Sequence, residues 1–150
     1  LFKNVLLKRD VSNENTVATL KKLYLAGVRR IDDYINEFFS ILERVMLLEN
    51  STIIVTADHG DEFNVHGGLS HDGKMYKELI DVPLLLFDSS LPKGQVSDNL
   101  VSLIDVSPTI IHLFGLKPVD HFEGHSLLPL DQYPDRGVLG EAVDKHGSKE

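Results

Sequence analysis

The sequence predicts a layered α/β fold, and three observations support this prediction. A long amphipathic helical pattern precedes a short β-branched apolar segment, a second apolar segment follows a Gly-rich loop, and another helical pattern comes after it. Alternation of helices with buried strands is typical of α/β layered folds. The 150 residues contain no repeat, low-complexity stretch or linker, so we expect a single unit over residues 1–150 without an internal boundary.

The first helix is expected after the polar cluster at residues 12–15, which suits a helix N-terminus. Apolar residues then recur every three or four positions and form one face of a helix; they are Val17, Leu20, Tyr24, Val28, Ile31, Ile35, Phe38, Leu42 and Val45. Gly27 allows a break or a close contact, and residues 49–51 are expected to end the helix. The adjacent Asp32 and Asp33 point about 100° apart on such a helix and are expected on its surface.

Two strands are expected next. Residues 52–56 form a β-branched run that is apolar on both faces, as in a buried parallel strand. Residues 82–87 form the second, with Pro83 near its start. Between them, residues 58–75 are rich in Gly and His, which predicts a long loop, and loops of this length are usually functional.

The last part of the chain predicts one helix and an irregular arm. Residues 102–108 open the helix, with Asp105 as the expected N-cap and Pro108 in the first turn. Gly115 is expected to stop it. Residues 117–136 read as an irregular arm, and residues 138–142 as a short final strand.

Composition excludes several classes of function. The net charge of −8 argues against binding to nucleic acid, which requires a basic face, and against an anionic membrane surface. No apolar run approaches the roughly 20 residues of a membrane span. There is no Cys, so disulfides and thiolate chemistry are excluded within this segment. This absence suits any compartment; a cytoplasmic location is preferred. The start of the chain reads as one entered in the middle.

A metal site is predicted where the first strand ends. In a parallel α/β sheet the active site lies beyond the C-terminal strand ends, and Asp58 and His59 occupy that position. A carboxylate and an imidazole there can ligate one divalent cation, and Gly60 lets the backbone turn sharply. Four acidic residues and three His fall between positions 58 and 72, a density typical of a site.

These motifs, in this order, resemble the sulfatase family of the alkaline phosphatase superfamily. The resemblance runs from about Tyr24 to the Gly-x-Ser-Leu-x-Pro turn. Its pieces are the long helix, the strand with Asp-His-Gly at 58–60, the loop to His66-Gly67-Gly68, the segment from Met75 to Leu84, Asp105-x-x-Pro-Thr, and Glu123 to Leu130. The resemblance implies an alkaline phosphatase-like fold, of which this chain is the C-terminal portion.

The resemblance also implies roles for single residues. Asp58 and His59 match the metal ligands; calcium is the family's usual ion, whereas the His nitrogen suits manganese or zinc better. His71 lies where relatives carry a Lys or His that contacts the transferring group, so we expect it to bind substrate and act in catalysis. Lys74 is the second candidate for substrate binding.

Three neighbouring loop residues have less specific expectations. His66 is expected to shape the loop, for example by a hydrogen bond to backbone, although a ligand role stays open. Asp61 and Glu62 are read either as partners of the ligands or as solvated acids.

The family's nucleophile motif, Cys/Ser-x-Pro-x-Arg, is missing from this chain, as are the paired Asp residues of its first strand. We therefore expect hydrolysis of small-molecule sulfate esters by a parent enzyme, with this segment inactive alone. Two alternatives stay open. One is a phosphodiester or phosphonate hydrolase, phosphoryl-group transferase or phosphoglycerate mutase of the same superfamily. The other is a non-catalytic α/β interaction domain.

Overall fold

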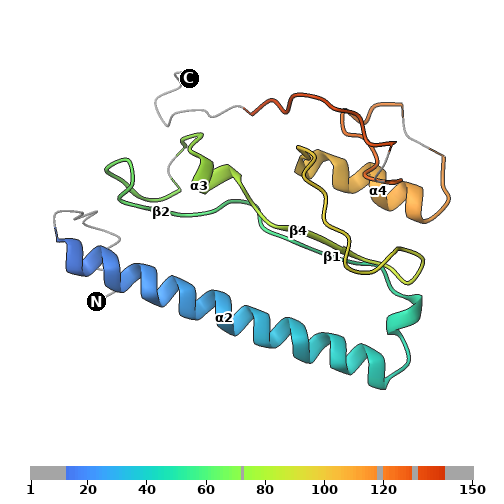
Figure 1. The fold of residues 1–150 in the computed structure, drawn as a ribbon, viewed down its shortest axis with the longest axis horizontal. Coiled ribbons are helices and arrows are strands. Elements are labelled where there is room, and N and C mark those ends of the chain that lie inside the picture. The colour runs from blue at the N-terminus through green and yellow to red at the C-terminus, as the bar shows by residue number, and fades with distance from the viewer. Residues whose placement is uncertain (1–12, 72, 118–119, 130–131, 141–150) are drawn as a thin grey trace. The chain divides into compact units, whose positions relative to one another are not determined.

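The computed structural model describes residues 13–71, 73–117, 120–129 and 132–140 (Figure 1). They fall into two compact units, one holding the described residues up to Pro92 and the other running from Lys93 to Gly140. The expectation of a single domain stays a prediction, because compact units also occur inside single domains. No helix among the described residues is long and apolar enough to cross a membrane.

Helix α2, Glu14–Arg44, is the longest element. The side chain of Asn13 caps its start by accepting hydrogen bonds from the backbone N–H groups of Asn15 and Thr16, at 3.0 and 3.3 Å. Gly27 does not break the helix. The helix ends several residues before the expected boundary, because Met46 adopts a left-handed conformation with φ 56°. A short turn of 3₁₀ helix, η1 (Leu48–Asn50), then leads to the first strand.

Helix α2 packs along the strands of the first unit, as Figure 1 shows. Phe39 meets Phe87 edge to face with ring centroids 5.3 Å apart, and Tyr24 meets Phe63 at 5.1 Å. Leu20 is the helix residue that is buried. The predicted apolar face is confirmed only in part: Leu20 is buried and Tyr24 packs on Phe63, whereas Phe39 contacts Phe87 from outside the predicted set. Val28, Phe38 and Val45 of that set are exposed.

The remaining surface of α2 includes the two acidic residues at positions 32 and 33. Both are exposed, as expected, and Asp33 Oδ1 lies 3.5 Å from Nε of Arg29, one turn earlier. The surface also carries apolar side chains such as Ile31, which is 58% exposed.

Strands β1 (Ile53–Thr56) and β4 (Leu84–Phe87) pair with each other. The pairing is antiparallel, with Ile53 opposite Phe87, so the expectation of a parallel strand is wrong for this pair. The expected burial is also incomplete, since no residue of β1 or β4 is fully buried and Leu85 is 60% exposed. An apolar, β-branched run favours a strand, and it does not specify the direction of the partner. The pair is tied at one end by the Thr52 hydroxyl, which donates to Asp88 at 2.5 Å.

The predicted loop between these strands is largely ordered. It contains the antiparallel hairpin β2 (Glu62–Phe63) and β3 (Leu69–Ser70), in which Glu62 pairs with Ser70. The one-turn helix α3 (Lys77–Ile80) follows and leads into β4. Hairpin and helix together frame the end of β1.

The second unit holds η2 (Leu103–Asp105) and α4 (Val106–Leu113). Pro108 lies in the first turn of α4, and Gly115, with φ 63°, ends it, as predicted. Asp105 occupies the N-cap position, but its side chain makes no cap hydrogen bond to α4. The described residues 138–140 form no strand, and residues 141–142 of that expected element lie outside the described residues.

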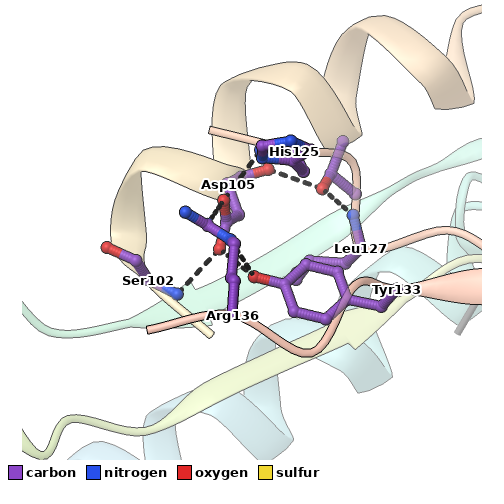
Figure 2. Close-up of polar contacts among 7 residues, drawn as sticks. Ser102, Asp105, His125, Leu127, Tyr133 and Arg136 are labelled. Carbon is purple, nitrogen blue, oxygen red and sulfur yellow. Dashed lines mark hydrogen bonds and ion pairs between the residues drawn. The ribbon is translucent and has the colours of Figure 1, made fainter. Parts of the chain in front are cut away.

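The carboxylate of Asp105 is fully buried and holds the irregular arm instead (Figure 2). It accepts hydrogen bonds from the backbone N–H groups of Ser102 and His125, both at 2.8 Å, and from the Tyr133 hydroxyl at 2.7 Å, and it pairs with Arg136. Burial raises the pKa of Asp105, but these hydrogen bonds and the Arg136 charge outweigh it and lower the pKa below 3.8. We call these five residues the Asp105 clasp.

Residues next to the clasp make further contacts that hold the arm. The buried Thr109 hydroxyl donates to the Asp105 carbonyl at 2.6 Å and accepts from the Leu127 N–H at 2.9 Å. Gly124 lies so close to η2 that a Cβ atom there would be 2.1 Å from the Ile104 carbonyl oxygen. The described part of the arm is therefore irregular, as predicted, yet fixed by polar contacts.

Candidate metal centre

Asp58 and His59 lie immediately after β1, where the sequence predicted them. The His59 ring Nδ1 lies 2.9 Å from the Gly60 carbonyl oxygen, which can only accept. Nδ1 therefore carries the proton, and Nε2 keeps its lone pair for a ligand. Asp58 Oδ2 lies 3.8 Å from this Nε2, and the Asp58 side chain is 90% exposed. Two ligands of one ion, each at about 2.1 Å, lie at most about 4.2 Å apart, so both can share a cation.

The corner is held against α3 by Gly60. Its N–H donates to the Leu79 carbonyl at 2.8 Å, and a Cβ atom at this position would lie 2.0 Å from the Glu78 carbonyl oxygen. Only glycine permits such an approach of two backbones. The sequence predicted a sharp turn here, and the structure gives the glycine a second reason, which is contact with a helix 18 residues later.

Glu62 fixes the hairpin that follows. It is 3% exposed, and its Oε1 accepts from the backbone N–H groups of His66 at 2.6 Å and Gly68 at 3.1 Å. A Cβ atom on Gly68 would lie 2.7 Å from Glu62 Oε2. Glu62 is thus a buried carboxylate that closes the turn, and the reading of it as a solvated acid is wrong.

His71 meets the corner at the other end of the hairpin. Its ring stacks on that of His59 with centroids 3.8 Å apart and an angle of 29° between planes. Its Nδ1 lies 3.2 Å from Asp61 Oδ1 and 3.0 Å from Ser70 Oγ. The structure therefore brings together Asp58, His59 and His71, which were predicted as one site.

Asp61 joins this cluster, and donor atoms of His59, Asp61 and His71 all lie within 4.8 Å of one another. The arrangement nevertheless does not suit one ion shared by both imidazoles. The lone pair of a ring nitrogen lies in the ring plane, and two rings stacked at 3.8 Å direct their lone pairs along separate planes. The pair of Asp61 and His71 is therefore considered separately from the corner of Asp58 and His59, whose role as metal ligands stays a prediction.

His66 and Lys74 both contact the ring of Tyr76. His66 stacks on Tyr76 at 3.8 Å, and its Nε2 lies 3.1 Å from Glu78 Oε1, a buried atom. Lys74 Nζ lies 5.3 Å from the centroid of the Tyr76 ring. His66 shapes the loop, as expected, through carboxylates of Glu62 and Glu78 and not through a backbone carbonyl. Lys74 contacts the Tyr76 ring, and its role in substrate binding stays a prediction.

Sequence reasoning missed the contributions of Glu62 and Glu78. Each is one acid among several in an acidic chain, and no spacing rule pairs Glu62 with backbone N–H groups four and six residues later. The signal that was present is the Gly67-Gly68 dipeptide, which allows a tight turn that a carboxylate can close.

The profile of the sulfatase family matches residues 8–116. The chain belongs to the sulfatase family. Among its relatives, the arylsulfatase K of Gallus gallus is 32% identical over 127 residues, which are 81% of this chain and 24% of that protein. The arylsulfatase K of Canis lupus familiaris is 30% identical over 123 residues, which are 82% of this chain and 22% of that protein. The sulfatase chain described here thus spans about a quarter of the length of these relatives.

Solved structures confirm the alkaline phosphatase-like α/β fold. The phosphonate monoester hydrolase SpPMH from Silicibacter pomeroyi matches with a TM-score of 0.76 at 24% identity, over 84% of this chain and 25% of that one. BT4656, solved in complex with its substrate D-glucosamine-2-N,6-O-disulfate, matches with a TM-score of 0.56 at 29% identity, over 71% of this chain and 22% of that one.

Sulfatase-family proteins bind a divalent metal ion, and the donors of this chain fit one. One carboxylate and one imidazole with a free Nε2, both exposed, converge at the end of β1. A nitrogen donor beside a carboxylate suits manganese or zinc better than calcium.

Proposed function

We propose that this chain is part of a metal-dependent hydrolase that cleaves sulfate esters, and that Asp58 and His59 supply two of its metal ligands. The observation that carries the proposal is the convergence of Asp58 Oδ2 and His59 Nε2, 3.8 Å apart, in a chain of the sulfatase family. When bound there, a divalent cation supplies positive charge to the oxygens of the ester. Calcium is the family's usual ion, and the nitrogen donor favours manganese or zinc.

His71 is proposed to contact the transferring group. Its stacking on His59 places it beside the metal ligands, and it is exposed enough to meet a substrate, with 52% of its side chain accessible. From this position it can hold an oxygen of the group or transfer a proton to the leaving alcohol. Lys74 is proposed as a second cation for the substrate oxygens, which requires its ammonium group to leave the Tyr76 ring.

The segment is proposed to be inactive alone. The nucleophile motif of the family is absent from its sequence, and its relatives are about four times as long. The donors at the end of β1 would then be completed by residues from elsewhere in the parent enzyme.

The test compares ester classes in the full-length protein that contains this chain. We expect a higher kcat/KM for an aryl sulfate than for the matching aryl phosphonate or phosphodiester, loss of turnover after chelation, and recovery with calcium, manganese or zinc. A preference for the phosphorus esters would replace the proposal by a phosphonate or phosphodiester hydrolase, which the His ligand also suits. Turnover that survives complete chelation would refute metal dependence.

A further inference from the structure

The pair formed by Asp61 and His71 has no counterpart in the roles described above. Asp61 Oδ1 lies 3.2 Å from His71 Nδ1, and the two side chains are 33% and 52% exposed. An ionised carboxylate only accepts hydrogen bonds, so Nδ1 carries a proton in this contact. The Ser70 hydroxyl, 3.0 Å from the same Nδ1, is then a second acceptor for that proton.

The hairpin explains why these two residues meet. Glu62 pairs with Ser70 across β2 and β3, so Asp61 and His71 are the next two positions beyond the ladder. Ser70 adopts φ 75°, a left-handed conformation that turns the chain at the end of β3. Register and turn together, and not chance proximity on the surface, place the carboxylate beside the ring.

The pairing decides which nitrogen faces a ligand. With the Nδ1 proton shared between Asp61 and Ser70, Nε2 of a neutral His71 carries the lone pair. An imidazole has this ambiguity and a lysine does not, since an ammonium group presents donors only. A histidine that presents one defined nitrogen to a ligand therefore benefits from a partner that selects its tautomer.

We propose that Asp61 is a positioning residue that holds His71 in the Nδ1–H tautomer and in its stack on His59, so that Nε2 faces the substrate. This inference rests on the proposed function for its catalytic consequence, whereas the tautomer itself depends only on the folded chain. The role parallels the carboxylate that orients a catalytic or metal-bound His in other enzymes.

The first experiment reads the tautomer directly. Side-chain ¹⁵N NMR spectra of the full chain, labelled at histidine and recorded where the rings are neutral, report which nitrogen of His71 is protonated. We expect Nδ1–H in the unmodified chain and a shift toward Nε2–H in Asp61→Ala. The control Asp33→Ala removes an exposed carboxylate from α2 and is expected to leave the His71 signals unchanged.

The second experiment is a double-mutant cycle on ester hydrolysis by the full-length protein. Asp61→Ala is expected to lower kcat by about 10- to 100-fold with little change in KM, the usual cost of losing a partner that orients a functional His. In a His71→Lys background, the same substitution is expected to change kcat by less than about twofold, because lysine has no tautomer to select.

The outcomes separate this inference from the proposed function. A His71 that is protonated on Nε2 in the unmodified chain, or a tautomer that Asp61→Ala leaves unchanged, overturns the inference. So does loss of manganese binding in Asp61→Ala with the tautomer retained, since Asp61 would then be a metal ligand. If no ester is hydrolysed but the tautomer shifts as expected, the proposed function fails and the pairing stands.

Discussion

The Asp105 clasp and the corner at Asp58 are both built around a carboxylate, and they differ in what surrounds it. Asp105 is fully buried and meets two backbone N–H groups, a phenol and a guanidinium. The Asp58 side chain is 90% exposed, and its described contacts are with the neighbouring His59 alone. Every acceptor position of the first is used inside the protein, whereas the second keeps capacity for a ligand.

This difference in burial and partners distinguishes a carboxylate that serves the fold from one that is available to a ligand. A buried carboxylate surrounded by donors stabilises the fold and leaves nothing for a substrate. An exposed carboxylate beside an imidazole with a free lone pair contributes little to stability and suits a cation. Removing each one should therefore harm a different property of the protein.

The largest expected effect is on stability, from Asp105→Ala. The substitution leaves the Arg136 charge, the Tyr133 hydroxyl and two N–H groups without their acceptor, and breaking a buried ion pair in this way costs about 3–5 kcal/mol. Urea unfolding followed by circular dichroism measures it. Asp33→Ala, on the exposed face of α2, is the control and should cost less than about 0.5 kcal/mol. Equal costs would mean that the clasp does not stabilise the chain.

Asp58→Ala should show the opposite behaviour. Losing a residue that only supports a metal ligand costs about 10- to 100-fold. We therefore expect loss of the proposed ligand Asp58 to lower sulfate-ester turnover by the full-length protein by more than about 100-fold. The free energy of unfolding should change by less than about 0.5 kcal/mol, because the side chain is exposed. Steady-state kinetics and urea unfolding of the same preparation check both. Unchanged turnover would remove Asp58 from the site.

Added metal ions should raise the thermal stability of the chain by a smaller amount, and only when Asp58 is present. An ion that binds only the folded chain at ten times its Kd stabilises it by about 1.4 kcal/mol, or roughly 3–6 °C in Tm. Melts with calcium, manganese and zinc should show this shift in the unmodified protein and in the control Asp33→Ala, but not in Asp58→Ala. A shift that persists without Asp58 would place the ion elsewhere.

The smallest expected effect is a fall in the free energy of unfolding at acidic pH. The folded-state pKa of Asp105 lies below its ordinary 3.8, so near that pH the unfolded chain binds more protons than the folded one. The stabilisation is complete above 3.8 and is lost as pH falls through the folded-state pKa. Unfolding free energies between about pH 6 and pH 3 should therefore fall less steeply in Asp105→Asn than in the unmodified chain. Equal slopes of unfolding free energy against pH in the two proteins would contradict a lowered pKa of Asp105.

Sequence predicted the elements whose signal is local. The existence of the long helix, the strand before Asp58, Pro108 in a first turn and Gly115 at a helix end all follow from residues within a few positions. The direction of β4 against β1 did not follow, because an apolar run carries no information on its partner.

The site was predicted in part for the same reason. The positions of Asp58 and His59 after a strand were predicted correctly, whereas their roles as metal ligands, and the role of His71 inferred from the family's spacing, stay predictions. The contact between Asp61 and His71 depends on the hairpin register, and the contact between Glu78 and His66 joins α3 to a turn 12 residues earlier. No local pattern contains either contact. The buried role of Asp105 depends likewise on Tyr133 and Arg136, about 30 residues later.

The Asp105 clasp also constrains how sulfatase segments can be exchanged. Two motifs that look independent in the sequence, Asp105-x-x-Pro-Thr and the turn around Ser126, share hydrogen bonds through Thr109 and Leu127. A crossover between them would join a carboxylate from one parent to donors from another. We therefore expect residues 102–136 to be exchangeable between sulfatases only as one segment. Chimeric proteins should fold only when both motifs come from the same parent.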